Sequence, residues 1–591
     1  MPKPLPECAP GTSPATSISF IGIYLIPSIH LEVMGLSKTP ISLQTQFTLT
    51  NATPIFGLIV VNGKLAIGID ESVAALKNVD LPTFALPNKP IINSKRLVNN
   101  GIYIYVVFWT KMIRECINVK IFIVLTIKQF WILMGGIVAV CVLDENVNNE
   151  KIIYQVFRGM QLLQHRGKAV WKISSGKFEV GGYGSLPTFD TIHEKIVKQL
   201  NHPMQTTVGH LSKKKPKSKR MERINFALDG FFIDLDKLTT HPLIRNRNSE
   251  PLEQIHYIFK ELLLAQKDPY KAAEFLDRHL RGNYVININK EIYVFRNSTG
   301  FKPLFLGKDE NELFFMVTSE NYLESFFHLK LKEINPGQLI RLSPKYGMDI
   351  LTQLDKNRIL MDPFEFIRES HVSSIFDNRS IYSIRKNIGN IQAQYLSNKN
   401  KDADMIFAEP DYTRPMALGL NIGFKNNGKK FEMVEGIIKD RYDDSDPMID
   451  YSEQVSKNKL LSNGKTLKFI ITPVTHNNNI LSVQGTIQTG GTVIETVFYL
   501  RKASAHKIDI VVSYVPTIDG RQVGLYTQQK DLIGRKYVGK ISYIDDLNKK
   551  IASELGADSV FYNSPEILAK GIGVHESQLW FPEWIRFLDY K

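Results

Sequence analysis

Hydrophobic positions after residue 134 alternate between runs typical of buried strands and runs typical of helices with one buried face. The run GIVAVCVL, residues 136–143, is rich in β-branched residues and ends at Asp144, which predicts a buried strand. Apolar residues then recur at intervals of three and four, which predicts a helix: Ile153, Val156, Phe157, Met160 and Leu163. Alternating runs such as EIYVFR (291–296) predict half-buried strands up to about residue 344.

A second pattern begins near residue 360, where helical and strand-like runs follow each other in turn. Helical patterns at 380–396, 414–424 and 492–504 alternate with the apolar runs DMIFAEP, FEMVEGII, ILSVQG and KIDIVVSYV. This alternation predicts a parallel sheet with right-handed crossovers. We expect two short helices within residues 545–569 and a C-terminal tail over 571–591.

Residues 1–133 differ from the rest of the chain. Eleven Lys or Arg and six Asp or Glu give only 17 charged residues in 133, and no chemistry-bearing motif is present. The segment is either a small β-rich domain or an extension of unknown role that a gene model adds upstream of a start at Met134. The second interpretation is favoured. The apolar run 121–143 is long enough to span a bilayer, but Lys128 and Gln129 interrupt it, so we expect no membrane partner.

The composition is that of a globular protein able to bury sizeable cores. The chain has 591 residues, 43% hydrophobic and 22% charged, with a net charge of +14 that suits anionic partners. The three cysteines, Cys8, Cys116 and Cys141, match no zinc or disulfide spacing. Their pattern, together with an N-terminus that lacks the features of a secretory signal, predicts a cytoplasmic protein.

Six segments, in order, resemble the amidophosphoribosyltransferases: LLQHRG (162–167), RNSTGFKPLFLG (296–307), FEFIRESHVSSIFDNRSIYSIRKNIG (364–389), EPDYTRPMALGL (409–420), EGIIKDRY (435–442) and LGADSVFYNS (555–564). The resemblance implies an α+β N-terminal-nucleophile domain of the class II glutamine amidotransferase type over 134–350. It also implies an α/β phosphoribosyltransferase-like domain with a parallel sheet over 360–570. In this family the first domain hydrolyses glutamine, and the second joins the ammonia to phosphoribosyl pyrophosphate (PRPP).

The glutaminase half departs from the family at every position that handles glutamine. The family's nucleophile is an N-terminal Cys whose own amino group is the general base, and Gly135 stands in its place. Cys141 lies on the same strand but has no α-amino group, so we interpret it as a buried apolar residue. The resemblance aligns Ser212 with the Arg that holds the substrate carboxylate, Asp229 with the oxyanion-hole Asn, and Asn248 with the Asp that holds the substrate amine. We therefore expect no catalytic residue here.

The basic run KKKPKSKR, residues 213–220, follows Ser212. It could bind nucleic acid, but a solvated surface loop is favoured, because no aromatic residues interleave the basic ones.

The PRPP loop keeps one part of its chemistry and lacks the other. The resemblance places it at 483–492, where Thr486, Thr489, Gly490, Gly491 and Thr492 can form a phosphate cradle at the start of a helix. Its two acidic residues are replaced by Gln484 and Gly485, which cannot offset the charge of Mg²⁺. A plain strand-to-helix turn is an equally favoured interpretation of 486–492.

The family's flexible loop, which closes over the diphosphate, aligns with 441–447. Lys439 and Arg441 are retained as substrate-binding candidates, but the loop's own Arg aligns with Ser445. Asp443, Asp444 and Asp446 add negative charge where an anionic leaving group would lie. A rearranged Mg²⁺ site, with Asp446 as the weak candidate ligand, is the alternative.

These departures predict a family member linked to purine nucleotide biosynthesis that is non-catalytic or regulatory, a pseudoenzyme without a certain cofactor. Its expected ligand is a phosphorylated ribose or a nucleotide. Its expected partner is an active amidophosphoribosyltransferase paralogue, in a homo- or hetero-oligomer. The alternative is an active enzyme that makes phosphoribosylamine from PRPP and free ammonia, with Mg²⁺ bound beside PRPP.

Overall fold

The computed structural model consists of two compact units, residues 1–129 and 130–591. It describes residues 135–143, 149–197, 204–213, 225–234, 238, 241–244, 251–355, 358–397, 403–439, 468–524 and 531–590, together with seven strands that precede residue 134.

The described residues of the first unit form six strands, all paired antiparallel. A four-stranded sheet is formed by β1 (Leu31–Val33), β2 (Leu43–Leu49), β3 (Phe56–Val61) and β4 (Lys64–Ala66). A separate hairpin joins β5 (Ile104–Ile113) to β6 (Cys116–Leu125). No helix in the part of the chain that the structure describes is long and apolar enough to cross a membrane.

The first half of the second unit contains two antiparallel sheets. The seven-stranded sheet has the order β10-β9-β11-β8-β16-β15-β17, and the six-stranded sheet has the order β19-β18-β14-β13-β12-β7. The bounds of the first sheet are β8 (Ile137–Val142), β9 (Val170–Ser175), β10 (Phe178–Tyr183), β11 (Thr206–Ser212), β15 (Phe305–Asp309), β16 (Phe314–Thr318) and β17 (Leu329–Glu333). Those of the second are β7 (Ile132–Leu133), β12 (Phe226–Phe232), β13 (Leu280–Ile288), β14 (Glu291–Arg296), β18 (Gln338–Ser343) and β19 (Gly347–Gln353).

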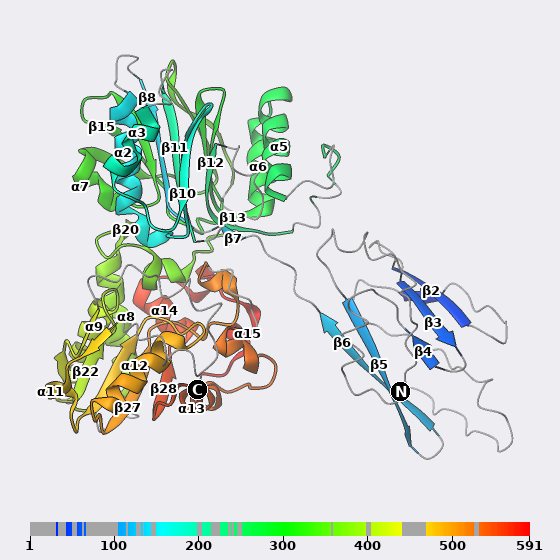
Figure 1. Cartoon of the computed structure of the whole chain (residues 1–591), viewed down its shortest axis with the longest axis vertical. Coiled ribbons are helices and arrows are strands. Elements are labelled where there is room, and N and C mark those ends of the chain that lie inside the picture. Colours follow the sequence, from blue (N-terminus) through cyan, green and yellow to red (C-terminus); the bar gives the residue numbers. More distant parts are fainter. Residues whose placement is uncertain are drawn as a thin grey trace. The chain divides into compact units, whose positions relative to one another are not determined.

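These sheets form the two inner layers of a four-layer α-β-β-α arrangement (Figure 1). One apolar cluster draws Ala139 and Val317 from the first sheet and Val285 and Val294 from the second, as expected for sheets packed face to face. The helices α2 (Asn149–Leu162) and α3 (Phe189–Val197) cover the outer face of the seven-stranded sheet. The helices α5 (Pro251–Lys260) and α6 (Pro269–His279) cover the six-stranded one.

The chain crosses from one sheet to the other just before Gly135. Leu133 of β7 pairs with Gly230 of β12, and Ile132 pairs with Phe231. After three further residues, β8 begins in the other sheet. The folded unit therefore includes backbone upstream of Met134, and the peptide at Gly135 lies within it.

The second half is a five-stranded parallel sheet in the order β23-β22-β26-β27-β28. Its strands are β22 (Met405–Ala408), β23 (Glu432–Val434), β26 (Asn479–Gln484), β27 (Lys507–Val512) and β28 (Ser559–Tyr562). One face packs on α8 (Ile381–Leu396), α9 (Arg414–Asn426) and α14 (Pro565–Ile572). The other face packs on α12 (Gly491–Lys502) and α13 (Ile544–Leu555). The α+β and α/β fold classes predicted from the sequence are both confirmed.

Two local predictions need correction. The segment 545–569 contains the two expected helices, α13 and α14, but Ser559–Tyr562 between them is the edge strand β28. The run FEMVEGII divides into β23 and β24 (Ile437–Lys439), and β24 pairs antiparallel with β25 (Lys468–Ile470) outside the main sheet. The remaining short elements are α7 (Glu324–Phe327), β20 (Ile375–Phe376), β21 (Arg379–Ser380), α11 (Thr472–Thr475) and α15 (Glu583–Phe587).

Residues 571–590 pack onto the second half of the unit. Leu579 and Ile585 are fully buried, and the Trp580 N–H donates to the Met361 carbonyl oxygen at 2.9 Å. This segment therefore holds the start of the connection between the two halves.

Two glycines allow α8 and α9 to approach each other closely. A Cβ atom at Gly389 would lie 2.0 Å from the Met416 carbonyl oxygen, and one at Gly419 would lie 1.8 Å from the Lys386 carbonyl oxygen. The crossing therefore requires that both positions lack a side chain.

We expect Gly419→Ala to lower the free energy of unfolding by about 2 kcal/mol or more, because overpacking outweighs the better helix propensity of alanine. Denaturant unfolding measures the change. Asn426→Ala, at an exposed position of the same helix, should change stability by less than about 0.5 kcal/mol. Equal stability of the two variants would contradict the close approach.

Candidate functional site

Gly135 lies in a space that admits no side chain. Its N–H donates to Asp229 Oδ1 at 3.3 Å. A Cβ atom at this position would lie 1.6 Å from the Leu211 carbonyl oxygen. Because this oxygen belongs to the backbone of β11, no side-chain rotation can relieve the overlap. The position that the sequence resemblance assigns to the nucleophile is therefore closed by the neighbouring strand β11.

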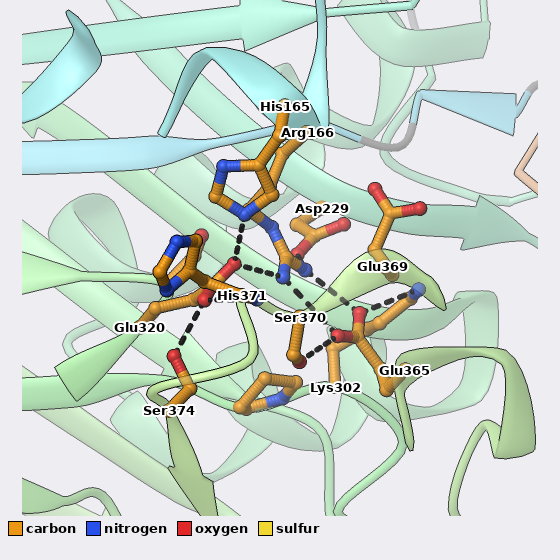
Figure 2. Close-up of polar contacts among 12 residues, drawn as sticks. His165, Arg166, Asp229, Lys302, Glu320, Glu365, Glu369, Ser370, His371 and Ser374 are labelled. Atoms are coloured by element: carbon orange, nitrogen blue, oxygen red, sulfur yellow. Dashed lines mark hydrogen bonds and ion pairs between the residues drawn. The ribbon is translucent and has the colours of Figure 1, made fainter. Parts of the chain in front are cut away.

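Arg166, whose Nε donates to the Gly135 carbonyl oxygen at 3.4 Å, is the centre of a buried ionic network (Figure 2). It follows α2 in a single turn of 3-10 helix and has no exposed surface. Its guanidinium contacts Asp229 Oδ2 at 2.8 Å, Glu320 Oε1 at 2.9 Å and Glu365 Oε1 at 2.7 Å. The first two carboxylates belong to the glutaminase-like half, and Glu365 belongs to the segment that connects it to the other half.

Lys302 is the second buried cation of the network. Its ammonium lies 2.7 Å from Asp362 Oδ2 and 2.8 Å from Glu365 Oε1, and all three side chains are fully buried. Ser370 Oγ donates to Glu365 Oε2 at 2.7 Å. Glu365 is thus shared by Arg166 and Lys302, and it links both to the connecting segment.

Glu320 makes an equivalent link from the glutaminase-like half. Its Oε2 accepts the Ser374 hydroxyl at 2.6 Å and the His371 N–H at 2.7 Å, while Oε1 lies 2.7 Å from His165 Nε2. The His371 ring stacks on Tyr322 at 4.3 Å. The two halves are therefore held together by carboxylates whose lone pairs are occupied.

Oppositely charged neighbours and burial shift the pKa values of the groups in this network. Burial alone would raise the pKa of Glu320, but His165 and Arg166 outweigh it and lower that pKa to about 2. Burial would lower the pKa of Lys302, but Asp362 and Glu365 raise it above its usual value. Burial raises the pKa of Asp362 to about 6 even beside Lys302. The cluster has more carboxylates than cations, and burial raises the pKa of two of these carboxylates, Asp229 and Asp362.

Asp229 and Cys141 are both completely buried. Burial raises the pKa of Asp229, and its two oxygens face the Gly135 N–H and Arg166. Cys141 is completely buried in β8, and burial raises the pKa of its thiol to about 12. A thiol with that pKa is not a nucleophile at neutral pH, which agrees with its interpretation as an apolar residue.

Of the other two positions aligned with glutamine-binding residues, Ser212 lies within the described residues and Asn248 does not. Ser212 is the last residue of β11 and is buried. Lys213, the first residue of the basic run, forms an ion pair with Glu369 at 2.5 Å and is nearly buried. Asn248 and residues 214–220 lie outside the described residues. At least one lysine of the basic run therefore belongs to the interior network.

The candidate phosphate cradle is a turn between β26 and α12. Gly490 is the residue before the helix and has a φ of +87°, which favours glycine. The Thr486 and Thr517 hydroxyl oxygens lie 3.1 Å apart, while Thr489 and Thr492 are partly exposed. Gly491 and Thr492 are the first two residues of α12, where backbone N–H groups point away from the helix. The turn thus brings Thr489, Gly490, Gly491 and Thr492 to one helix N-terminus.

The places of the two acidic residues are taken by other contacts. Gln484 is buried and donates to Glu409 Oε2 at 3.2 Å, and Lys468 pairs with the same carboxylate at 2.5 Å. A Cβ atom at Gly485 would lie 2.2 Å from the Tyr412 ring. The guanidinium of Arg368 lies 4.9 Å from the centre of that ring. The second acidic position is therefore filled by an aromatic side chain.

The remaining candidates for substrate or metal binding lie in and after β24. Lys439 ends β24, while Arg441 and the three aspartates Asp443, Asp444 and Asp446 lie outside the described residues. Within the described residues, no three His, Cys, Asp or Glu side chains come together as metal ligands.

The sequence did not predict the ionic network as a site. Its cations, Arg166 and Lys302, lie within LLQHRG and GFKPL, and Glu365 lies within FEFIRES, all segments that carried the family resemblance. A charged residue flanked by apolar ones was the available signal. Nothing in the sequence pairs Arg166 with Glu365, because 199 residues separate them.

Several known proteins with similar sequences are named amidophosphoribosyltransferase. No family model matches the chain. It is 25% identical over 472 residues to the amidophosphoribosyltransferase of Methanocaldococcus jannaschii, which covers 73% of this chain and 92% of that protein. It is 22% identical over 433 residues to the amidophosphoribosyltransferase of Synechococcus elongatus, which covers 70% of this chain and 83% of that protein.

Two solved structures have a similar fold at 20% sequence identity. The first, described as the allosteric regulatory enzyme of purine biosynthesis, has a TM-score of 0.58 over 75% of this chain and 94% of its own. The second, glutamine PRPP amidotransferase of Bacillus subtilis in complex with ADP and GMP, has a TM-score of 0.56 over 74% and 92%. Over most of its length the chain is thus similar in sequence to amidophosphoribosyltransferases, and it has the two-part fold of the two solved structures.

Proposed function

We propose that this protein is a non-catalytic or regulatory member of its family that serves purine nucleotide biosynthesis by binding a ligand rather than transforming it. One shared observation carries the proposal. At the nucleophile position and at the second acidic position the chain has glycine, and the space of the missing side chain is occupied, by the Leu211 carbonyl at Gly135 and by the Tyr412 ring at Gly485. A substrate-handling group has no room at either position.

The environment of each position supports the same proposal. The carboxylates near Gly135 all form ion pairs with Arg166, so they stabilise the fold rather than bind a substrate. In the other half, Glu409 is neutralised by Lys468, which leaves it a poor Mg²⁺ ligand. The retained turn 486–492, with its left-handed Gly490, supports a phosphorylated ribose or a nucleotide as the ligand. The complex of the Bacillus subtilis relative with ADP and GMP agrees with that class of ligand.

The alternative is an active enzyme that uses free ammonia and PRPP. The turn at the N-terminus of α12 favours it, because such a turn can hold a phosphate without the two acidic residues. It requires that aspartates of the 443–446 segment supply the Mg²⁺ ligands. It therefore predicts Mg²⁺-dependent PRPP binding that is lost in the variant Asp443→Ala/Asp444→Ala/Asp446→Ala.

The purified full chain, supplied with PRPP and Mg²⁺ and with either glutamine or ammonia, should form no phosphoribosylamine above background. Product with ammonia alone would establish the alternative. Product with glutamine would overturn both. Intact-mass analysis of the native protein would identify any active paralogue that co-purifies in a hetero-oligomer.

Ligand binding should depend on the turn before α12. We expect Thr489→Val/Thr492→Val to raise the Kd for a nucleoside monophosphate by about tenfold, because two hydroxyl donors are lost. Isothermal titration calorimetry measures this. Thr472→Val, at an exposed position, should bind like the unaltered chain.

Restoring the thiol alone should not restore glutaminase activity. We expect Gly135→Cys to release no glutamate from glutamine and to unfold at a lower temperature, because its Cβ overlaps the Leu211 carbonyl. Ser185→Cys, which adds an exposed thiol, should unfold like the unaltered chain. Glutamate release by Gly135→Cys would show that the site can still open.

The Arg166 network should behave as a structural core. We expect Arg166→Met to lower the free energy of unfolding by about 3–5 kcal/mol, because it leaves buried carboxylates without a counter-charge. Arg158→Met, on the exposed face of α2, should change it by less than about 0.5 kcal/mol. Urea unfolding compares the two variants, and similar midpoints would contradict a structural role.

A further inference from the structure

Arg368 is a cation that the network around Arg166 does not use. It lies in a turn of π-helix, Glu365–Glu369, within the connection between the two halves. Glu365 and Glu369 are buried and pair with cations of the network, as Figure 2 shows for Glu365. Arg368 is the one residue of the turn that is partly exposed. Single turns of π-helix occur frequently at functional sites, so Arg368 is a candidate for a function of its own.

The Arg368 side chain reaches the carboxyl end of the parallel sheet. Its guanidinium lies over the ring of Tyr412, 4.9 Å from the centre of that ring. Tyr412 follows β22 and is partly exposed. The same ring lies against Gly485, which directly follows the neighbouring strand β26. Arg368 is thus held one aromatic ring away from the residue that precedes the turn 486–492, at the end of the sheet where open α/β folds bind ligands.

The carboxylates at this end of the sheet are paired with other cations. Glu409 lies 2.5 Å from Lys468, and Asp411, the neighbour of Tyr412, lies 3.4 Å from Arg414. Within the part of the chain that the structure describes, Arg368 forms no ion pair, and its charge faces the ring of Tyr412 instead. Its positive charge is therefore available to an anion from outside the chain.

A second guanidinium adds positive charge behind Arg368. Arg385 of α8 is 1% exposed, and it donates to the carbonyl oxygens of Phe366 at 2.9 Å and Ser370 at 2.7 Å rather than to a carboxylate. Burial is the main cause that lowers the pKa of Arg385 to about 10, and the like charge of Arg368 acts in the same direction. A bound anion beside Arg368 would reduce this repulsion.

We propose that Arg368 binds a second anionic group of the ligand held by the turn 486–492, so that the chain recognises a sugar with two phosphorylated positions without a divalent cation. Its guanidinium supplies the positive charge that Mg²⁺ would supply beside an acidic pair, which this chain has replaced by Gln484 and Gly485. This role rests on the proposed function, because the turn must hold the first phosphate. It adds a ligand class with anionic groups at two positions and a binding mode that needs no metal.

Isothermal titration calorimetry of the full chain in EDTA tests this role with PRPP and ribose 5-phosphate. Both ligands carry the 5-phosphate, and PRPP alone carries a diphosphate at the other end of the sugar. PRPP should bind about tenfold more tightly, because only its diphosphate pairs with Arg368. Added Mg²⁺ should not raise the affinity for PRPP. Equal affinities in EDTA, or PRPP binding that requires Mg²⁺, would overturn the proposal.

Variants of Arg368 separate its charge from its packing on Tyr412. Arg368→Gln should raise the Kd for PRPP about tenfold, to that for ribose 5-phosphate, while unchanged binding of ribose 5-phosphate shows that the variant is folded. Arg368→Lys, which keeps the charge, should bind PRPP more tightly than Arg368→Gln does. Arg278→Gln, which removes an exposed arginine from α6, should change neither affinity. A preference for PRPP that survives Arg368→Gln, or equal loss in Arg368→Lys, would overturn the proposal.

The two ligands also separate this role from the proposed function. Thr489→Val/Thr492→Val alters the contact with the shared 5-phosphate and should weaken both ligands by the same factor. Absence of binding of either ligand to the unaltered chain would overturn the proposed ligand class and the role of Arg368 together. Binding of both ligands with equal affinity would overturn the role of Arg368 alone.

Discussion

The buried contact between Arg166 and Glu365 determines how the two halves of the second unit meet. A guanidinium without exposed surface is tolerated only when carboxylates surround it. Here those carboxylates come from β12, from the segment after β16 and from the connection between the halves. The connection must therefore pass beside Arg166, whose Nε donates to the Gly135 carbonyl oxygen at 3.4 Å.

The two positions that depart most from the family have a common physical state. Each is a glycine, and each is covered by atoms that cannot move cheaply: the backbone of β11 at Gly135 and the ring of Tyr412 at Gly485. Interiors are close-packed, so a lost side chain is replaced by its neighbours rather than by a void. A side chain can therefore return to Gly135 or Gly485 only if the residues that now occupy its space also change.

Periodicity and turn chemistry in the sequence were sufficient to predict most of the architecture. The helix predicted at 380–396 is α8, because Ser380 caps its first turn and its apolar spacing is regular. Strand β28 was missed because SVFY is short and lies between two helical patterns. The closure at Gly135 could not be predicted, because it depends on Leu211, 76 positions away in the chain. The pairing of Arg166 with Glu365 depends on the tertiary fold in the same way.

The pairing of β7 with β12 has a consequence for the biogenesis of this protein. Enzymes with an N-terminal nucleophile need their chain cut, so that the reactive residue carries a free amine. In this chain a cut before Gly135 would separate it from Ile132–Leu133, which protect the edge of β12 at Gly230 and Phe231. Exposed strand edges promote association with other chains. Maturation by proteolysis would therefore create a free terminus at Gly135 and also expose an aggregation-prone sheet edge. The uncut chain is the better-protected form.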